Sequence, residues 1–360
     1  MAAWYTSNRR PMYYVGMDTE SLIVDGGPIT PAELVDVARN GRPVQVGDNA
    51  IDLMEASRKT VEAVVASDEA IYGINTGFGA LSTTKISRDR LCDLQMNLLR
   101  SHAAGAGNPL NSDIVRGMMV LLTASLCRGH SGVRPSLAQC LVEMLNAGVT
   151  PVIPSLGSVG ASGDLAPLAH LALVICGEGN ATLGGTTMSG KAAMGKAGIT
   201  PIVPCEKEGL ALINGTHMMA SIAALAHADI AVLCETAVIA TAMSIDAAKA
   251  TNTFLDDRLH EARGQSGQRN VAKSIAHHLQ GSTILESHTK GDPRVQDPYS
   301  FRCAPQVLGA AIEAIARVSG IITTELGAVT DNPLVFSSTN DIVSGGNFHG
   351  MPLAIAMDEL

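Results

Sequence analysis

The chain has 360 residues, a formal net charge of −9, and 46% hydrophobic against 16% charged residues. This balance excludes a disordered chain, and the lack of a concentrated basic patch argues against nucleic acid as a partner. Aromatic residues make up only 3%, so the core must be built from aliphatic side chains and methionine. That palette suits helices better than strands, and the length fits one large domain or two ordinary ones.

The cysteines and the apolar segments favour a cytoplasmic protein. Seven cysteines stand singly with no CxxC pair, which is typical of reduced thiols in a cytoplasmic protein. The N-terminal stretch lacks the apolar core of a signal peptide. The apolar segment from Met218 to Ala250 is interrupted by charged residues and His227, and therefore predicts a buried helix rather than a membrane span.

The N-terminal part predicts helices with recognisable starts. Residues 1–20 look like an extension. Thr30 and Pro31 precede the apolar pattern of residues 32–39, with threonine at the N-cap and proline in the first turn. Residues 51–67, 91–100, 112–127 and 137–147 show helical spacing of apolar side chains. Some β-structure is expected between residues 180 and 204, including a short strand at Ile202 and Val203.

Two glycine-containing segments each carry an unexpected polar or aromatic residue. The loop AIYGINTGFGALS at residues 70–82 holds Tyr72, and the segment SHAAGAG at residues 101–107 holds His102. From the residues alone, Tyr72 either pins the loop or acts chemically, since functional residues favour loops. His102 is either a capping histidine or a ligand-facing one.

The central stretch is GSVGASGDLAPLAH at residues 157–170. Glycines flank the short triplet formed by Ala161, Ser162 and Gly163. Asp164 is a good N-cap for the apolar helix predicted over residues 165–176, so the triplet lies at a helix N-terminus that favours negative charge. The spacing matches neither the nucleophile elbow nor the phosphate-binding loop. A glycine-rich loop before a core helix is the simplest interpretation of this pattern.

Later segments add polar residues in apolar surroundings. EGLALINGTHMM at residues 208–219 places Asn214 and a glycine inside an apolar run, which interrupts regular structure. HEARGQSGQ at residues 260–268 resembles a connection, and the spacing of the nearby histidines argues against a metal. In VQDPYSFRCAPQ, Gln296, Tyr299 and Arg302 are spaced three apart and would share one face of a helix. Arg302 could hold a carboxylate through two parallel hydrogen bonds.

These motifs, together with TDNPLVF at residues 330–336 and SGGNFHGMP at residues 344–352, resemble the histidine and aromatic amino acid ammonia-lyases. The resemblance runs from about Ala70 to the last residue. It implies a mainly α protein of L-aspartase/fumarase-like architecture, with a long-helix bundle and a smaller mixed α/β N-terminal part. The expected division is an extension (1–20), a domain with the triplet and the tyrosine loop (21–213), and an incomplete bundle (214–360). Family chains continue past Leu360, so a C-terminally truncated form is expected.

The resemblance also implies a cofactor and a set of site residues. The triplet would cyclise into a 4-methylidene-imidazol-5-one (MIO) electrophile, with no metal and no nucleotide. Tyr72 or Tyr299 would remove a proton, and Arg302 would hold the substrate carboxylate. The remaining site residues would orient the amino acid head group (Asn214 and Gln296) and receive its side chain (His102 and Phe348).

The pair His102-Ala103 resembles histidine lyases, which indicates a carbon–nitrogen lyase that converts L-histidine to trans-urocanate in histidine degradation. His217, where glutamine is common in histidine lyases, departs from that pattern. Alternatives are a tyrosine or phenylalanine lyase or an aminomutase of the same family, or an inactive oligomerising fragment. The family implies a homotetramer with shared sites. The cysteines and the composition favour a cytoplasmic protein with no nucleic acid or membrane partner.

Overall fold

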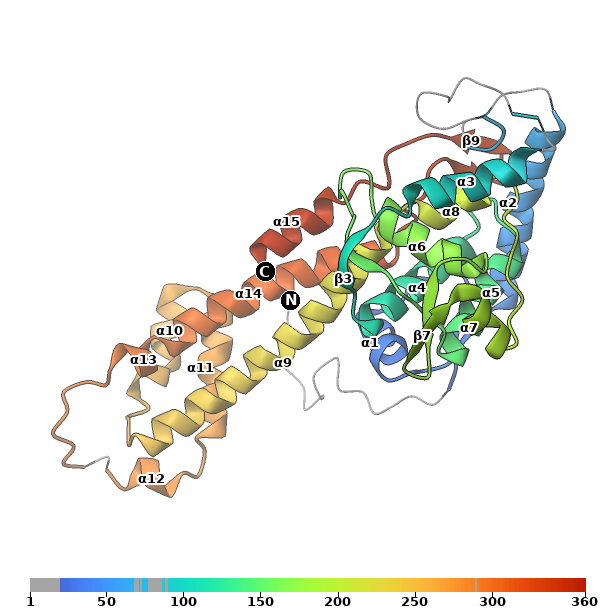
Figure 1. The fold of residues 1–360 in the computed structure, drawn as a ribbon. Coiled ribbons are helices and arrows are strands. Elements are labelled where there is room, and N and C mark those ends of the chain that lie inside the picture. Colours follow the sequence, from blue (N-terminus) through green and yellow to red (C-terminus); the bar gives the residue numbers. More distant parts are fainter. Residues whose placement is uncertain (1–19, 68–70, 72, 77–85, 88–89, 289) are drawn as a thin grey trace. The chain divides into compact units, whose positions relative to one another are not determined.

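The computed structural model describes residues 20–67, 71, 73–76, 86–87, 90–288 and 290–360 (Figure 1). The chain forms two compact units. Among the described residues, the larger unit comprises residues 20–225 and Ile321–Ala356, and the smaller one comprises Ala226–Gly320 with the terminal segment Met357–Leu360. The expected domain boundary between residues 213 and 214 stays a prediction.

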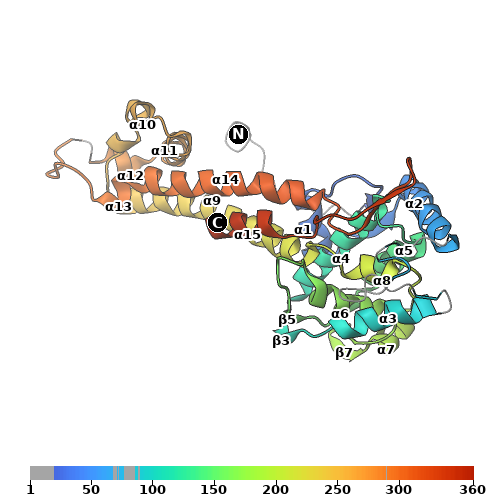
Figure 2. The ribbon, with the colours of Figure 1, turned by 90° about the horizontal axis from the view of Figure 1, so that it is seen from above.

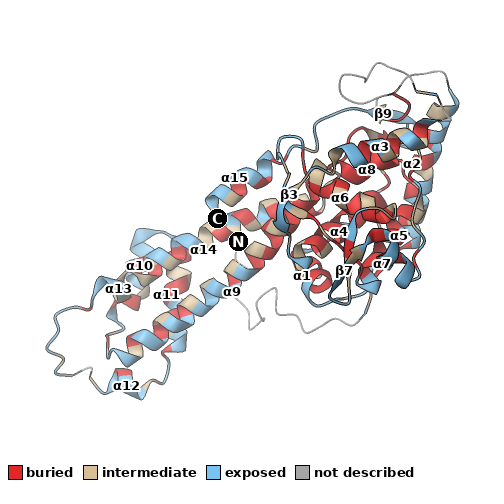
Figure 3. Ribbon diagram, viewed as in Figure 1, coloured by how far each residue is buried: buried red, intermediate tan, exposed pale blue. Residues whose placement is uncertain are grey.

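The larger unit is mostly helical, as predicted. Its helices are α1 (Pro31–Arg39), α2 (Asp48–Ala66), α3 (Leu91–His102), α4 (Ser112–Cys127), α5 (Pro135–Ala147), α6 (Leu165–Ile175), α7 (Gly190–Lys196) and α8 (Glu208–Ile213), and α15 (Met351–Glu359) begins in it. Figure 3 shows that α4, α5 and α6 are largely buried. Their aliphatic and methionine side chains form the core, which confirms what the composition predicted.

The start of α1 follows from local sequence chemistry. The Thr30 hydroxyl accepts the Glu33 N–H at 3.2 Å, and the Glu33 carboxylate accepts the Thr30 N–H at 2.9 Å. This reciprocal capping satisfies two backbone donors that the helix cannot use, and Pro31 needs no donor at its position. The predicted N-cap is confirmed.

The strands of the larger unit are short. Within the described residues they form four separate sheets. β1 (Leu22–Val24) is parallel to β2 (Val44–Val46), and β3 (Ala106–Pro109) is antiparallel to β5 (Pro154–Leu156). β4 (Thr150–Pro151), β6 (Asn180–Leu183) and β7 (Thr186–Ser189) form a three-stranded sheet, and β8 (Leu334–Phe336) pairs with β9 (Asp341–Val343). The expected strand at Ile202 and Val203 is wrong. Ile202 instead donates its N–H to the carbonyl of Ile175 at the end of α6, at 2.9 Å.

The smaller unit is built on two long helices. The greater part of α9 (His217–Ala247) runs beside α14 (Ala304–Leu326), as Figure 2 shows. His227 Nε2 on α9 lies 3.2 Å from the Ile315 carbonyl oxygen on α14. Its shorter helices are η3 (Thr253–Leu255), α10 (Asp257–Arg263), α11 (Ser266–His278), α12 (Thr283–Glu286) and α13 (Tyr299–Arg302). The connection expected over residues 260–268 is shorter than predicted: α10 continues to Arg263 and α11 begins at Ser266, so only Gly264 and Gln265 connect them, with Gly264 at φ 78° as the left-handed cap.

The apolar segment from residue 218 is helical as predicted, although the helix ends at Ala247 and is only partly buried. Leu233 and Met243 are 65% and 67% exposed in this chain. Two helical stretches, Glu208–Ala247 and Tyr299–Leu326, are long and apolar enough to cross a membrane. Core helices of soluble proteins meet the same criteria, so length and composition alone are weak evidence for a span.

Candidate active site

The triplet forms the tip of a tight turn in front of α6. The Gly163 N–H donates to the Gly160 carbonyl at 3.2 Å, and both glycines have φ near +73°. Only glycine adopts that backbone region without a steric cost. Ala161 and Ser162 are exposed at the tip, whereas Gly163 is buried. The Ser162 side chain is therefore exposed, while the backbone at Gly163 beneath it is buried.

Two distant backbone segments close around Gly163. A Cβ atom on this residue would lie 2.5 Å from the Gly215 carbonyl oxygen and 3.0 Å from that of Phe348. The Gly350 N–H also donates to the Gly160 carbonyl at 2.9 Å. The triplet is thus held by backbone from two other parts of the larger unit, one at Gly215 and one at Phe348 to Gly350. A group built from the triplet's own backbone atoms fits this cradle, because position 163 carries no side chain.

Asp164 has a different role from the one predicted. It stands at the N-cap position of α6, but its side chain makes no capping bond to that helix. Its Oδ2 instead accepts the N–H groups of Met218 and Met219, at 2.8 and 3.0 Å, in the first turn of α9. Burial raises the pKa of this carboxyl to about 6. Asp164 therefore links the N-termini of α6 and α9, where a carboxylate is stabilised by the helix dipole.

Asn214 lies beside the triplet, on the turn between α8 and α9. The predicted interruption of the helix is confirmed, since α8 ends at Ile213 and Gly215 adopts φ 140°. The Gly215 carbonyl accepts the Asp164 N–H at 2.8 Å, which joins this turn to the triplet segment. The Asn214 side chain is buried, and its Nδ2 donates to the Asn332 carbonyl at 2.8 Å. The amide is therefore held in one orientation.

His102 ends α3 and bonds within its own helix. Its Nδ1 lies 2.9 Å from the Leu98 carbonyl oxygen and 3.0 Å from the Ser101 hydroxyl. Because a carbonyl oxygen only accepts, Nδ1 carries a proton in this arrangement. The following loop is tied to α6, where His170 Nε2 accepts the Gly105 N–H at 3.1 Å. Burial lowers the pKa of His170, which keeps it a neutral acceptor.

His217 is a buried imidazole at the start of α9. Within the described chain neither ring nitrogen has a hydrogen-bond partner. The ring lies against Gly215, where a Cβ atom would sit 2.7 Å from Nδ1. Burial lowers the pKa of His217 to about 3, so the ring is neutral at physiological pH.

The second group of predicted residues belongs to the smaller unit. Tyr299 and Arg302 lie on α13, with the guanidinium 4.9 Å from the centre of the tyrosine ring. Gln296 is not on this helix: it lies exposed in a bend before Tyr299, where α13 begins. The prediction that all three share one helical face is therefore wrong.

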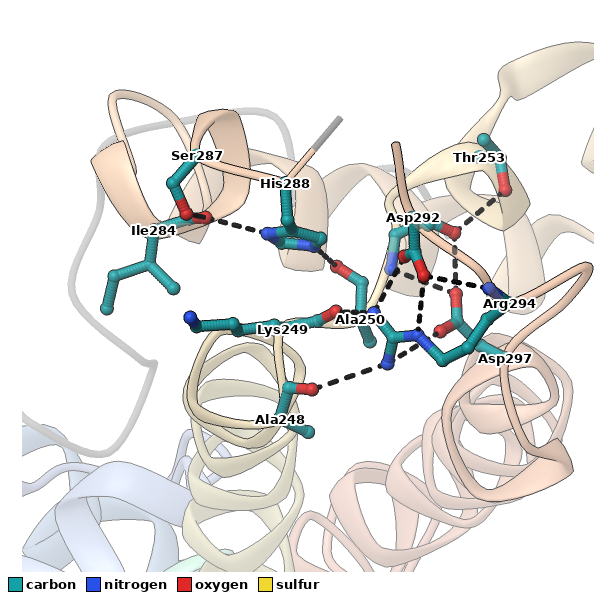
Figure 4. Close-up of polar contacts among 11 residues, drawn as sticks. Ala248, Lys249, Ala250, Thr253, Ile284, Ser287, His288, Asp292, Arg294 and Asp297 are labelled. Carbon is teal, nitrogen blue, oxygen red and sulfur yellow. Dashed lines mark hydrogen bonds and ion pairs between the residues drawn. The ribbon is translucent and has the colours of Figure 1, made fainter. Parts of the chain in front are cut away.

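The segment before α13 is fixed to the C-terminal end of α9 (Figure 4). The Asp297 carboxylate accepts the Thr251 N–H at 2.9 Å and its hydroxyl at 2.5 Å. Arg294 donates to the Ala248 and Lys249 carbonyls and pairs with Asp292. Sequence reasoning missed these anchors, although Asp297 stands inside the VQDPYSFR motif. They position Tyr299 and Arg302.

The other predicted site residues have simpler outcomes. Phe348 is half-buried, and its backbone approaches Gly163. Tyr72, the other tyrosine predicted as a base, lies outside the described residues. Among the residues that are described, no three His, Cys, Asp or Glu side chains are grouped so as to hold a metal. The seven cysteines are free thiols.

Comparisons with known proteins agree with these motifs. The family model for aromatic amino acid lyases matches residues 29–360. The chain is 46% identical over 342 residues to a histidine ammonia-lyase of Gloeobacter violaceus, covering 95% of this chain and 66% of that protein. The solved histidine ammonia-lyase of Trypanosoma cruzi superposes with a TM-score of 0.86 at 39% identity, over 94% of this chain and 64% of that one.

A phenylalanine aminomutase of Pantoea agglomerans superposes equally well, with a TM-score of 0.87 at 32% identity, over 94% of this chain and 69% of that one. The chain spans about two thirds of the length of the curated relatives it matches. The match over residues 29–360 and the shared fold are sufficient to assign the family. This chain belongs to the aromatic amino acid lyases.

Proposed function

We propose that this protein eliminates ammonia from L-histidine to give trans-urocanate, using an MIO electrophile formed from Ala161, Ser162 and Gly163. The names of its relatives support a histidine substrate: the Gloeobacter violaceus and Alkaliphilus oremlandii proteins, at 46% and 45% identity, are both histidine ammonia-lyases. The backbone cradle around Gly163 carries the proposal. It confines a turn whose outer residue is a serine, and it leaves no room for a side chain at position 163.

The chemistry of cyclisation fits this turn. The Gly163 nitrogen would attack the Ala161 carbonyl carbon, and that condensation releases one water molecule. Loss of the Ser162 hydroxyl with a Cα proton releases a second and leaves the methylidene carbon. The mature group supplies an electrophile that activates the amino acid for loss of ammonia. The N-terminus of α6 follows directly, and its dipole favours negative charge at this place.

The chain's own side chains would bind and orient the substrate. Arg302 would take the carboxylate, since a guanidinium matches its two oxygens. Asn214 would present its amide oxygen to the amino group, with Gln296 assisting. His102 Nε2 would accept a proton of the substrate imidazole, and Phe348 would line the pocket beside it. Tyr72 or Tyr299 would remove the β-proton.

We further propose that the protein works as a cytoplasmic homotetramer with sites shared between copies. Exposed apolar side chains on the long helices of the smaller unit support an assembly that covers them; they include Leu233, Met243 and Val307. The solitary free cysteines support a reducing compartment.

A substrate panel tests the proposed reaction. The purified protein is incubated with L-histidine, L-tyrosine and L-phenylalanine, and formation of the unsaturated acid is followed by absorbance. Urocanate from L-histidine is expected to dominate. Preferred turnover of tyrosine or phenylalanine, or a β-amino acid as product, would replace histidine elimination by one of the family's other reactions. No turnover of any of the three would favour a non-catalytic role.

A further inference from the structure

We infer that the buried ion pair of Lys207 and Asp331 is a positioning element of the active site, which acts on Asn214 through Asn332. This assigns the TDNPLVF motif, which contains Asp331 and Asn332, a role in positioning Asn214. The proposed reaction by itself gives the motif no role. The inference rests on the proposed function, because it concerns the residues that would hold the substrate.

The ion pair is fully enclosed. Lys207 Nζ lies 2.6 Å from Asp331 Oδ2, and their side chains are 0% and 2% exposed. Lys207 also adopts φ +70°, a left-handed conformation that residues with a Cβ avoid unless their surroundings enforce it. The chain therefore accepts a strained backbone and two desolvated charges at the start of α8. Such features cluster where a protein needs a fixed geometry.

The pair fixes the peptide that follows it. While Asp331 Oδ2 binds the lysine, Oδ1 accepts the N–H of Asn332 at 2.6 Å. With one oxygen on each partner, the carboxylate cannot rotate without breaking a bond. The orientation of the Asp331–Asn332 peptide unit, and with it the position of Asn332, thus depends on Lys207.

Asn332 in turn holds two parts of the candidate site. Its carbonyl accepts Nδ2 of Asn214 at 2.8 Å, and its side-chain Oδ1 accepts the Gly345 N–H at 2.6 Å. The first bond sets the direction of the Asn214 amide, so that its oxygen is presented in a single orientation. The second fixes the start of the segment that leads to Phe348. One asparagine therefore connects the ion pair to the head-group residue and to the side-chain pocket.

A neighbouring ion pair provides the comparison. Glu208, next to Lys207, is equally buried and binds Arg134 at 2.7 Å. Its carboxylate also accepts the Cys205 N–H, and Arg134 donates to the Val203 carbonyl. These bonds secure the segment before α8 and do not involve Asn332. A merely structural role for the Lys207–Asp331 pair would make the two pairs equivalent in their effects on substrate binding.

The decisive experiment is a double-mutant cycle with Asn214→Ala, in the full chain and with L-histidine. Lys207→Met combined with Asp331→Leu removes both charges and leaves neither one buried alone. Asp331→Asn is a second variant that preserves the shape. We expect kcat/KM to fall about 10- to 100-fold in either variant, with most of the change in KM. In the Asn214→Ala background the same changes should cause little further loss.

Arg134→Met with Glu208→Leu is the matched control, and any loss it causes should be the same factor in both backgrounds. The inference is overturned if the Lys207–Asp331 variants keep wild-type kinetics, or if their loss multiplies fully with that of Asn214→Ala. Absence of histidine turnover by the wild-type chain would instead contradict the proposed function.

A readout without catalysis separates these two failures. Hydrogen–deuterium exchange of the peptide around Gly345 reports on the bond from its N–H to Asn332. Exchange at this amide should speed up in the Lys207–Asp331 variants and remain as in wild type in the Arg134–Glu208 control. Unchanged exchange in the former would refute the connection whether or not the protein turns over histidine.

Discussion

The guanidinium carbon of Arg302 lies 4.9 Å from the centre of the Tyr299 ring, so the cation stacks on the ring face. Tyr299 is 74% exposed in this chain, and this contact orients it. Arg302 is itself oriented by its Nε, which donates to the Asp297 carbonyl at 2.6 Å. The Asp297 carbonyl therefore orients the proposed carboxylate ligand, Arg302, and Arg302 in turn orients Tyr299, one of the two proposed bases.

Replacing Arg302 by lysine should weaken substrate binding. Arg302→Lys keeps the positive charge but loses the planar fork and the hydrogen bond to Asp297. We expect KM for L-histidine to rise by about 10- to 100-fold, measured by steady-state kinetics. Arg258→Lys is the control, because Arg258 is 89% exposed on α10 and pairs only with Asp256 in the described chain. An unchanged KM in Arg302→Lys would remove Arg302 from the site.

Two glycines of the same turn should respond differently to alanine. Gly160 and Gly163 share φ +73°, so Gly160→Ala and Gly163→Ala incur the same conformational cost, about 1 kcal/mol. A Cβ at Gly160 meets open space, whereas one at Gly163 lies 2.5 Å from the Gly215 carbonyl. Peptide mass should therefore show the cyclised triplet in Gly160→Ala and its absence in Gly163→Ala. Equal maturation of the two variants would contradict the role of the cradle.

His217 should make the fold sensitive to acid. Its pKa is about 3 in the folded chain and would be about 6.5 when unfolded. Between these values the unfolded chain binds a proton that the folded chain does not. The contribution of neutral His217 to the free energy of unfolding is thus complete above pH ~6.5. It falls by at most about 1.4 kcal/mol per pH unit as the pH drops below that value. Urea unfolding of wild type and His217→Gln should show that the stability of the variant increases relative to that of wild type as the pH falls. A constant difference between pH ~7.5 and ~5 would oppose this.

Asp164 should have the opposite pH dependence. Its pKa is about 6 when folded, above about 3.9 for an unfolded aspartate. The folded chain therefore binds more protons between these values, so stability is lost as the pH rises from ~4 to ~6 and is level above that. Asp164→Asn removes this dependence while keeping an oxygen that can accept from α9. Unfolding curves should show that the stability of the variant increases relative to that of wild type as the pH rises over this range. A relative increase toward low pH would contradict the assignment.

Local chemistry made much of the fold predictable. The capped start of α1 and the boundaries of α4 follow from neighbouring residues, because caps and 3.6-residue periodicity act within a few positions. The errors arose where a local pattern was ambiguous. The polar run at residues 260–268 is helical except at Gly264 and Gln265, since α10 and α11 each have an exposed face that accommodates polar residues. Gln296 is outside α13 because Pro298 precedes its first residue and disfavours a helical conformation just before it.

The motifs that form the candidate site could be predicted from the sequence. The contacts between residues far apart in the chain could not. Asp164 looks like a cap for the helix that follows it, yet its carboxylate binds α9, more than fifty positions later. Lys207 and Asp331 are separated by 124 positions, and no spacing rule connects them. Such pairs are determined by how the elements pack. The catalytic roles of the triplet, Tyr72 and Tyr299 stay predictions, and so do the substrate-binding roles of the other site residues (His102, Asn214, Gln296, Arg302 and Phe348).

The most direct test is the mass of the peptide spanning Gly157–His170, released from the purified protein under conditions that preserve a cyclised backbone. The account predicts a deficit of two water molecules in the wild-type peptide and none in Ser162→Ala, whose fold should be intact and whose turnover of L-histidine should be abolished. An unmodified wild-type peptide would contradict the proposed electrophile, and with it the reaction assigned to this site.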